Sequence, residues 1–476
     1  MNPLRTLLTL LAAGLCACAV GPDYEPVDFP VGDEWATIGA PTGTPPARWW
    51  EQFEDPLLDE LIATALGENL DLRIAAERIA EARAAQRLVE SQRRPAVEAA
   101  GSVARQRQSE RGPLPAGRVP GIETYQTVYD VGLDARWELD VFGRIQRSVE
   151  AADARFEAAV EQLRDAQVTV SAEVARVYFE LRGAQRELVA IEAAVQAGDD
   201  TLALVRRRYD AGSGSLVEVR QAEAEVATTR TRLAPVRARR DSAALALGAL
   251  LGELPEAGLA MVATATTHAD LQTVPVGTRA DLLRRRPDVR RAERQLAAAT
   301  ADIGVAEGEL YPKLVLGANG GFTSLASGDL FDADARRWTL APFLSWRVLD
   351  GGRVQAEIAA ADSRQQQAAL AYERAILQAV TEAEQALSAY QRAVEGIASQ
   401  QAALAAAAAA ETLTRRRYEA GLVSLLVLLD AQRRVDDVEA QLARAQADAA
   451  VRIALLYKAL GGGWEALDPD ALASGR

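Results

Sequence analysis

The phrase RRRYDAGSGS, Arg206–Ser215, returns 209 positions later as RRRYEAGLVS, Arg415–Ser424. The same offset places WELDVFGRIQ, residues 137–146, on WRVLDGGRVQ, residues 346–355, without a gap. At an offset of 217, RPAVEAAGSV, which begins at Arg94, falls on YPKLVLGANG. Self-similarity at a fixed offset is the signature of a repeated structural unit. The chain is therefore predicted to consist of two tandem copies of one unit.

Each copy contains segments with the alternation typical of β-strands. From Tyr125 to Val141 apolar side chains occupy every odd position except Thr127, and polar side chains occupy most of the even ones. Trp338 to Val348 repeats this pattern, and weaker alternation follows Pro95 and Pro312. The sequence predicts one β-hairpin per copy, with strands at about 95–107 and 124–141 in the first copy and about 312–324 and 337–349 in the second.

A long helix is predicted after each hairpin. Residues 143–209 contain no Pro and only two interior glycines, and residues 352–418 repeat the feature. At 1.5 Å per residue each helix is on the order of 100 Å long. Gly212 and Gly421 stand where a helix end favours the left-handed region, and Ser215 and Ser424 can cap the helix that returns. The repeated phrase therefore predicts the tip of a helical hairpin, at 210–215 and again at 419–424.

Composition argues against an enzyme and against a nucleic-acid-binding protein. The chain has 53 Lys and Arg against 67 Asp and Glu, a formal net charge of -14, whereas nucleic-acid binders present basic surfaces. One His, His268, and two Cys leave few groups for metal or nucleophilic chemistry. Motifs of the types GxxxxGK[ST], HExxH and GxSxG are absent from the sequence.

The N-terminus has the features of an export signal. Arg5 precedes an apolar run, Leu7 to Leu15, that is too short to span a bilayer. Leu15, Cys16, Ala17 and Cys18 then resemble a bacterial lipobox, so residues 1–17 are predicted to be a lipoprotein signal peptide. Cys18 would carry a covalent lipid and begin an extended segment, 18–48. The alternative is an ordinary cleaved signal without a lipid.

Four amphipathic strands cannot close a membrane barrel, because such barrels need eight or more. Two copies of the chain would supply eight strands and three copies twelve, and only the larger barrel leaves a lumen wide enough for solutes. The alternative is a soluble sheet packed against the helices.

Several stretches together resemble the TolC/OprM-like outer membrane factors of bacterial efflux systems, in particular their lipidated branch. They are CAVGPDYEP from Cys18, WWEQFEDPLLDELIATALGENLDLRIAAERIAEARA from Trp49, DLLRRRPDVRRAE from Asp281 and the two tip phrases. The resemblance implies an α+β membrane protein that forms a homotrimer. In this trimer a twelve-stranded outer membrane β-barrel continues into a periplasmic α-helical barrel. The implied partners are a periplasmic adaptor (membrane fusion protein), a proton-driven inner membrane pump of the RND type and outer membrane lipid, with no cofactor beyond the lipid on Cys18.

The expected organisation is then as follows: signal peptide 1–17, lipidated segment 18–48, repeat one 49–254, linker 255–280, repeat two 281–461 and C-terminal tail 462–476.

The resemblance also implies roles for residues at the hairpin ends. The tips would meet the adaptor through Ala211, Gly212, Ser215, Ala420, Gly421 and Ser424. Asp430 and Arg433 match positions where relatives place gate residues, and repeat one has Gln221 and Ala224 there. Many relatives carry a further acid one turn earlier, where this chain has Val427.

These features favour an outer membrane exit duct for small toxic compounds. A duct for proteins secreted by a type I system is the alternative within the same fold. A periplasmic adaptor is a third possibility, but adaptors resemble a single hairpin inserted in β domains rather than two tandem ones.

Overall fold

The computed structural model describes residues 19–26, 29–32, 34–37, 43–111, 116, 123–263 and 274–465. The expected signal peptide 1–17, Cys18 and residues 466–476 of the expected tail lie outside the described residues. The chain forms two compact units: Met1–Val27, Ala80–Ala158 and Ala292–Tyr372 in the first, and Asp28–Ile79, Ala159–Arg291 and Glu373–Arg476 in the second. Each unit therefore takes segments from both sequence repeats.

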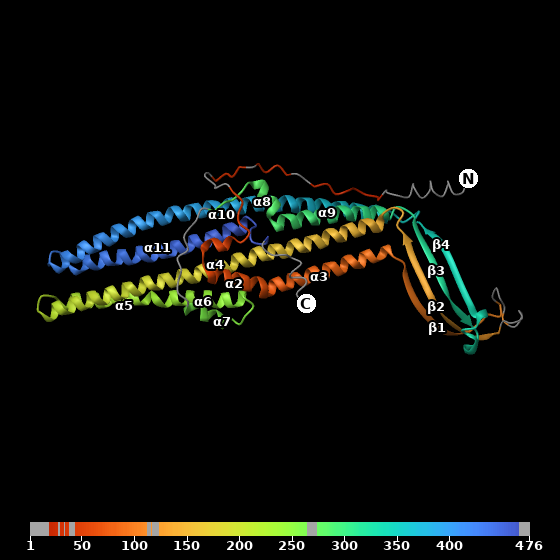
Figure 1. Cartoon of the computed structure of the whole chain (residues 1–476), viewed down its shortest axis with the longest axis horizontal. Coiled ribbons are helices and arrows are strands. Elements are labelled where there is room, and N and C mark those ends of the chain that lie inside the picture. The colour runs from red at the N-terminus through yellow and green to blue at the C-terminus, as the bar shows by residue number, and fades with distance from the viewer. Residues whose placement is uncertain are drawn as a thin grey trace. The chain divides into compact units, whose positions relative to one another are not determined.

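The first unit contains a four-stranded antiparallel sheet in the order β1-β2-β3-β4 (Figure 1). Its strands are β1 (Ala96–Arg107), β2 (Tyr125–Leu139), β3 (Lys313–Ser324) and β4 (Arg336–Ser345). Equivalent residues pair in both hairpins: Ala96 lies opposite Arg136 in the first, and their equivalents at the offsets of 217 and 209, Lys313 and Ser345, lie opposite each other in the second. The hairpin of each repeat thus has the same register, and β2 pairs with β3 to join them.

The last strand of each hairpin is shorter than the alternation predicts. β2 ends at Leu139 rather than 141, and β4 ends at Ser345 rather than 349. The reason is a carboxylate that starts the next helix. Asp140 accepts a hydrogen bond from the Gln146 amide at 2.7 Å, and Asp350 accepts bonds from the amides of Gly352 and Val354 at 2.9 Å each.

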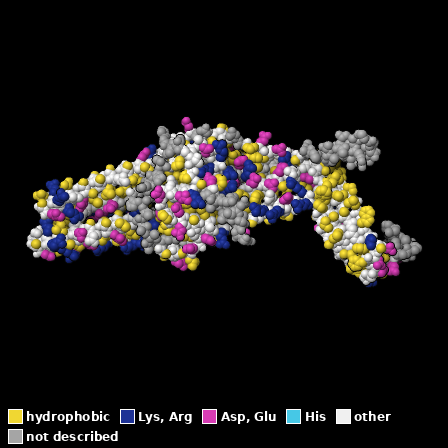
Figure 2. Space-filling view, in the orientation of Figure 1, with side chains coloured by type: hydrophobic (Ala, Val, Ile, Leu, Met, Phe, Trp, Pro, Cys, Tyr) yellow, Lys and Arg dark blue, Asp and Glu magenta, His cyan; other side chains and the backbone are white. Residues whose placement is uncertain are grey.

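The two faces of the sheet differ in polarity. One face exposes large apolar side chains: Val97, Val103, Leu133, Trp338, Leu340 and Leu344. Figure 2 shows hydrophobic side chains gathered over the strands. On the other face Arg337 donates to Asp130 at 2.7 Å and to Asn319 at 3.2 Å. Asp130 also accepts a bond from Thr323 at 2.6 Å. These four polar side chains form one hydrogen-bonded group, whereas the apolar face is left open within the described residues.

The long helices α4 (Arg144–Asp210) and α10 (Arg353–Glu419) have 67 residues each and coincide at the offset of 209. The shorter helices that precede the strands are α3 (Leu70–Glu90) and α9 (Pro287–Gly308). In the second unit α5 (Leu216–Thr231) and α6 (Leu233–Leu250) return along α4, and α11 (Leu425–Ala459) returns along α10 (Figure 1). None of the described helices is long and apolar enough to cross a bilayer.

The return path is broken in repeat one and continuous in repeat two. The break falls at Arg232, between α5 and α6. Pro235 lies three residues beyond it, and the equivalent position in α11 is Arg444. Proline lacks the amide hydrogen and its ring clashes with the carbonyl of residue i−4, here Thr231, where α5 ends. A single residue thus accounts for two helices in place of one.

Short helices and aromatic rings complete the second unit. The helices are α2 (Pro56–Glu68), α7 (Pro255–Leu259) and α8 (Arg279–Arg285), so the expected linker 255–280 contains α7. Trp49 is fully buried and stacks on Tyr457 with ring centroids 5.0 Å apart. Phe53 contacts Trp49 and the Phe179 ring of α4.

A buried carboxylate joins the two helical hairpins within the second unit. Glu187 of α4 is almost fully buried and accepts hydrogen bonds from Arg239 of α6 at 2.5 Å and from Arg444 of α11 at 2.9 Å. Burial alone would raise the pKa of Glu187, but the two guanidinium groups hold it below its usual value. One turn away Gly183 lets α11 approach closely, because a Cβ there would overlap the Ala447 methyl.

We expect Glu187→Ala to lower the free energy of unfolding by about 2 kcal/mol. Removing one partner of a buried ion pair costs more than this, but both arginines are half exposed and regain water. Glu192→Ala is the matched control, since Glu192 pairs with Arg237 on the surface of the same region and its loss should cost less than about 1 kcal/mol. Thermal unfolding in detergent measures both. Equal effects would contradict a joining role for Glu187.

Candidate channel mouth and attachment site

The two hairpin tips have the same backbone hydrogen bonds at the offset of 209. In repeat one the amides of Ala211, Gly212 and Ser213 donate to the carbonyls of Arg207, Tyr209 and Arg208. In repeat two the amides of Ala420, Gly421 and Leu422 donate to those of Arg416, Tyr418 and Arg417. Gly212 has φ +77° and Gly421 has φ +74°, the left-handed region that side chains disfavour. A Cβ at either glycine would meet nothing within 4 Å, so the requirement there is conformational.

The two caps that follow the tips differ. Ser215 forms a capping box, in which its side chain accepts from the Glu218 amide and the Glu218 carboxylate accepts from the Ser215 amide. Ser424 occupies the equivalent position but makes no capping hydrogen bond through its side chain. Position 427, which corresponds to Glu218, is Val427 and has no carboxylate to complete the box. The expectation that both serines cap therefore applies to Ser215 alone.

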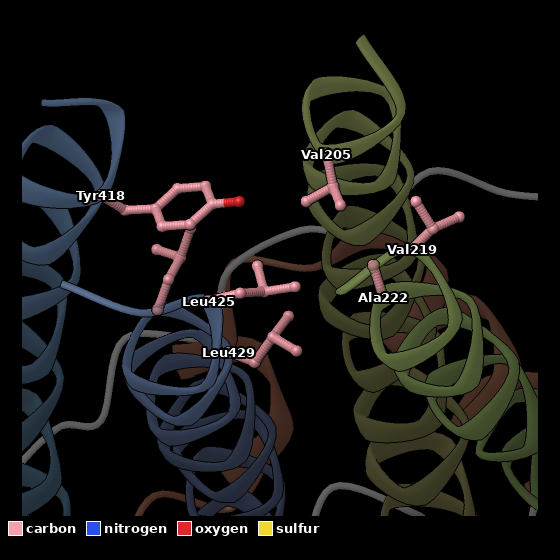
Figure 3. Packing of buried hydrophobic residues seen from close by; sticks show 7 residues of the cluster. Val205, Val219, Ala222, Tyr418, Leu425 and Leu429 are labelled. Carbon is pink, nitrogen blue, oxygen red and sulfur yellow. The ribbon is translucent and has the colours of Figure 1, made fainter. Parts of the chain in front are cut away.

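All six residues predicted to meet an adaptor lie at the exposed hairpin ends: Ala211, Gly212, Ser215, Ala420, Gly421 and Ser424. Behind them a hydrophobic cluster holds the two hairpins together (Figure 3). It consists of Val205, Val219, Ala222, Tyr418, Leu425, Leu428 and Leu429. The cluster takes residues from α4, α5, α10 and α11, so the tips of the two repeats are fixed to each other within one chain.

The two residues predicted to form a gate have separate partners in this structure. Asp430 accepts a hydrogen bond from Arg434, one turn later on α11, at 3.2 Å. Arg433 donates to Glu225 of α5 at 2.9 Å. The Arg433 pair therefore links the second hairpin to the first, while the Asp430 pair is exposed and lies within one helix. Sequence reasoning missed both partners. Arg434 lies four residues after Asp430, a spacing that pairs side chains on one helix, and could have been found, whereas only the packing of α11 against α5 identifies Glu225.

A second acidic position lies one to two turns beyond this pair. Burial raises the pKa of Asp436 to about 6, although Arg232 opposes the shift; neighbouring acids, Asp437 foremost, raise the pKa further. Arg232 itself binds Asp437 at 2.6 Å. A second ion pair, after Arg433–Glu225, therefore joins the first hairpin to α11, at the break between α5 and α6.

The first described residues are held firmly in the first unit. The Val20 amide donates to the Phe142 carbonyl at 3.1 Å, and Arg147 donates to the carbonyls of Val20 at 2.9 Å and Gly21 at 3.1 Å. Arg147 also pairs with Asp23 at 2.7 Å. A Cβ on Gly143, which has φ +76°, would lie 2.6 Å from the Ala19 Cα. This attachment site places Ala19, the neighbour of Cys18, beside the turn between β2 and α4.

Comparison with known proteins identifies relatives over nearly the whole chain. The family of outer membrane efflux proteins matches residues 61–253 and 279–462. The solvent efflux pump outer membrane protein SrpC of Pseudomonas putida is 33% identical over 475 residues, which cover 96% of this chain and 97% of that protein. Outer membrane protein OprJ of Pseudomonas aeruginosa is 32% identical over 464 residues, which cover 96% and 95%.

Solved structures agree with these sequence matches. The outer-membrane channel OprN superposes with a TM-score of 0.86 at 34% identity, covering 94% of this chain and 100% of that one. CusC, whose solved structures concern folding and transmembrane channel formation, superposes with a TM-score of 0.83 at 29% identity, covering 94% of this chain and 100% of that one.

The gate hypothesis predicts a more conductive channel when both charged residues are removed. Asp430→Ala combined with Arg433→Ala breaks the Arg433–Glu225 link and should raise single-channel conductance in planar bilayers while trimers persist. Gln221→Ala, at the repeat-one position equivalent to Asp430, is the control and should leave conductance unchanged. An unaltered conductance in the double variant would remove the gate assignment.

Proposed function

Because the chain belongs to the outer membrane efflux protein family, we propose that it serves as the exit duct of a tripartite efflux system. Three copies form a passive channel that carries small toxic compounds from the periplasm to the exterior. The observation that carries this proposal is the sheet of four strands, whose two outer strands and apolar face have no partner within the described residues.

The open edges of the sheet support closure by further copies of the chain. In a bilayer an unpaired strand edge is unfavourable, because no water replaces the missing hydrogen bonds. Three copies give twelve strands when β4 of one copy pairs with β1 of the next. The repeat offsets even set the register: Ala135 lies opposite Ala318 in β2 and β3, so the equivalent residues Leu344 and Gly101 should lie opposite each other between copies.

The two faces of the sheet then have distinct environments. Trp338, Leu340 and Leu344 face lipid, and the hydrogen-bonded Asp130 and Arg337 face the lumen, as the alternation in membrane barrels requires. The channel itself catalyses no reaction in this proposal.

The relatives support small molecules as the transported class. SrpC is named for solvent efflux, and the 30% identical CusC of Escherichia coli K12 is named for cation efflux. The energy for export comes from a proton-driven inner membrane pump of the RND type, which a periplasmic adaptor connects to the duct.

A lipid on Cys18 is the second element of the proposal. The attachment site supports it, because Arg147 binds the Val20 carbonyl and Ala19 packs against Gly143, next to the end of β2, where a barrel strand leaves the membrane. Cys18→Ser should abolish incorporation of radiolabelled palmitate in cells, whereas Cys16→Ser should preserve it. A labelled Cys18→Ser protein would contradict the assignment.

Export of a fluorescent lipophilic dye from living cells tests the function. Deleting the gene should raise dye accumulation, and the intact gene should restore export. The proteins secreted into the medium serve as the second readout. Loss of a secreted protein with normal dye export would favour the type I secretion duct instead.

The adaptor contact predicts different results for two substitutions at one tip glycine. Gly421→Asn keeps a residue that tolerates φ +74°, so dye export should persist. Gly421→Trp adds bulk at the exposed end and should abolish export from normally assembled trimers, because the adaptor cannot approach. Cross-linking to the adaptor measures the contact directly. Equal loss of trimer in both variants would leave Gly421 a purely structural role.

A further inference from the structure

Of two equivalent contacts between the hairpins, only one is made among the described residues, although both repeats carry the side chains for it. Arg208 of α4 lies over the Tyr418 ring, with its guanidinium carbon 4.8 Å from the ring centroid, and donates to the Tyr418 carbonyl at 3.0 Å. The repeat-equivalent residues are Arg417 and Tyr209. Among the described residues Arg417 and Tyr209 make no such contact. Both side chains are exposed, on a side of each hairpin that the hydrophobic cluster does not cover and that we call its free flank.

Equivalent residues of the two repeats also differ in burial. Tyr418 is 2% exposed, but its equivalent Tyr209 is 44% exposed. Leu425 is 1% exposed, but its equivalent Leu216 is 50% exposed. The first hairpin therefore presents, on its free flank, the side chains that the second hairpin buries.

The free flank of the second hairpin carries the other half of the contact. Leu204 of α4 packs against the hydrophobic cluster, whereas its equivalent Leu413 is 60% exposed. Arg417 is exposed as well. Inside the chain, Tyr418 and Leu425 of the second hairpin pack against Arg208 and Leu204 of the first. The equivalents of these four residues are exposed on the two free flanks: Tyr209 and Leu216 on the first hairpin, Arg417 and Leu413 on the second.

Exposure at a tip does not by itself indicate a second copy. Val217 and Leu426 are equivalent and are exposed in both repeats, so neither has a buried counterpart that defines its partner. Where a residue is buried in one repeat and its equivalent is exposed in the other, the buried contact shows which surface of this same chain would cover the exposed residue.

We infer that Arg417 of one copy stacks on Tyr209 of the next copy, and that Leu413 packs there against Leu216. This contact repeats the Arg208–Tyr418 contact between chains and closes the ring of hairpin ends at the periplasmic mouth. The inference rests on the proposed trimer and adds the residues that join its copies at this end. A guanidinium over an aromatic face is favourable even at a partly exposed site.

Cysteine cross-linking tests the contact between copies. The variant Tyr209→Cys with Arg417→Cys, treated in membranes with a short bifunctional thiol reagent, should give covalent dimers and trimers on denaturing gels. Both substituted side chains are exposed, so the fold should tolerate the change. The two single variants should stay at the monomer position.

The matched control is the repeat-equivalent pair, Arg208→Cys with Tyr418→Cys. Its cross-link forms within one chain, so this variant should run as a monomer of altered mobility. Light scattering of untreated samples gives the copy number independently. Trimers that fail to cross-link through 209 and 417 would overturn the inference and leave the exit duct standing, whereas a monomeric chain would overturn the proposed function.

A conservative substitution separates stacking from simple packing. Tyr209→Phe keeps the aromatic face and should keep the low conductance of the closed channel. Tyr209→Leu and Arg417→Ala remove the stack and should both raise single-channel conductance. Equal conductance in all three variants would contradict a closing role for this contact.

Discussion

Unpaired backbone groups at the edges of a sheet are the constraint on which the rest of this structure depends. β1 and β4 are the outer strands of the four-stranded sheet, and a bilayer offers no water to satisfy their free amides and carbonyls. A chain with only four strands must therefore obtain closure from other copies. In the proposed trimer the strands form a ring, and because α4 and α10 continue from the same sheet, the helices are expected to form a ring as well.

The duplicated sequence meets this constraint with a single set of contacts used repeatedly. The two β-hairpins have the same pairing register, the two long helices have 67 residues each, and the two tips have the same backbone hydrogen bonds. Trp137 donates to the Arg93 carbonyl at 3.0 Å, and its equivalent Trp346 donates to the Leu310 carbonyl at 3.0 Å. Contacts inside one chain therefore indicate what the contacts between chains should be.

Local chemistry made the elements of the fold predictable, and long-range packing made the partners unpredictable. The alternation around Tyr125 and the glycines of the tips act through neighbouring residues, so the sequence alone reveals strands and turns. The break at Arg232 could also have been found, since Pro235 has no counterpart in repeat two. In contrast, Glu187 meets Arg444 across 257 residues, and Arg433 meets Glu225 across 208. No spacing in the sequence relates such pairs, because each depends on how two hairpins pack.

The places where the repeats diverge are the places where their surroundings must differ. A ring of three duplicated chains has six hairpins in two alternating environments, so equivalent residues of the two repeats can have different partners. The second tip has no capping box, because the position equivalent to Glu218 is Val427. The position equivalent to Ala224 is Arg433, which adds a link back to the first hairpin. The second hairpin thus exchanges local helix capping for contacts with its neighbour. In the proposed gate, release of the Arg433–Glu225 link separates the second hairpin from the first without breaking a side-chain cap, because Ser424 makes no capping hydrogen bond.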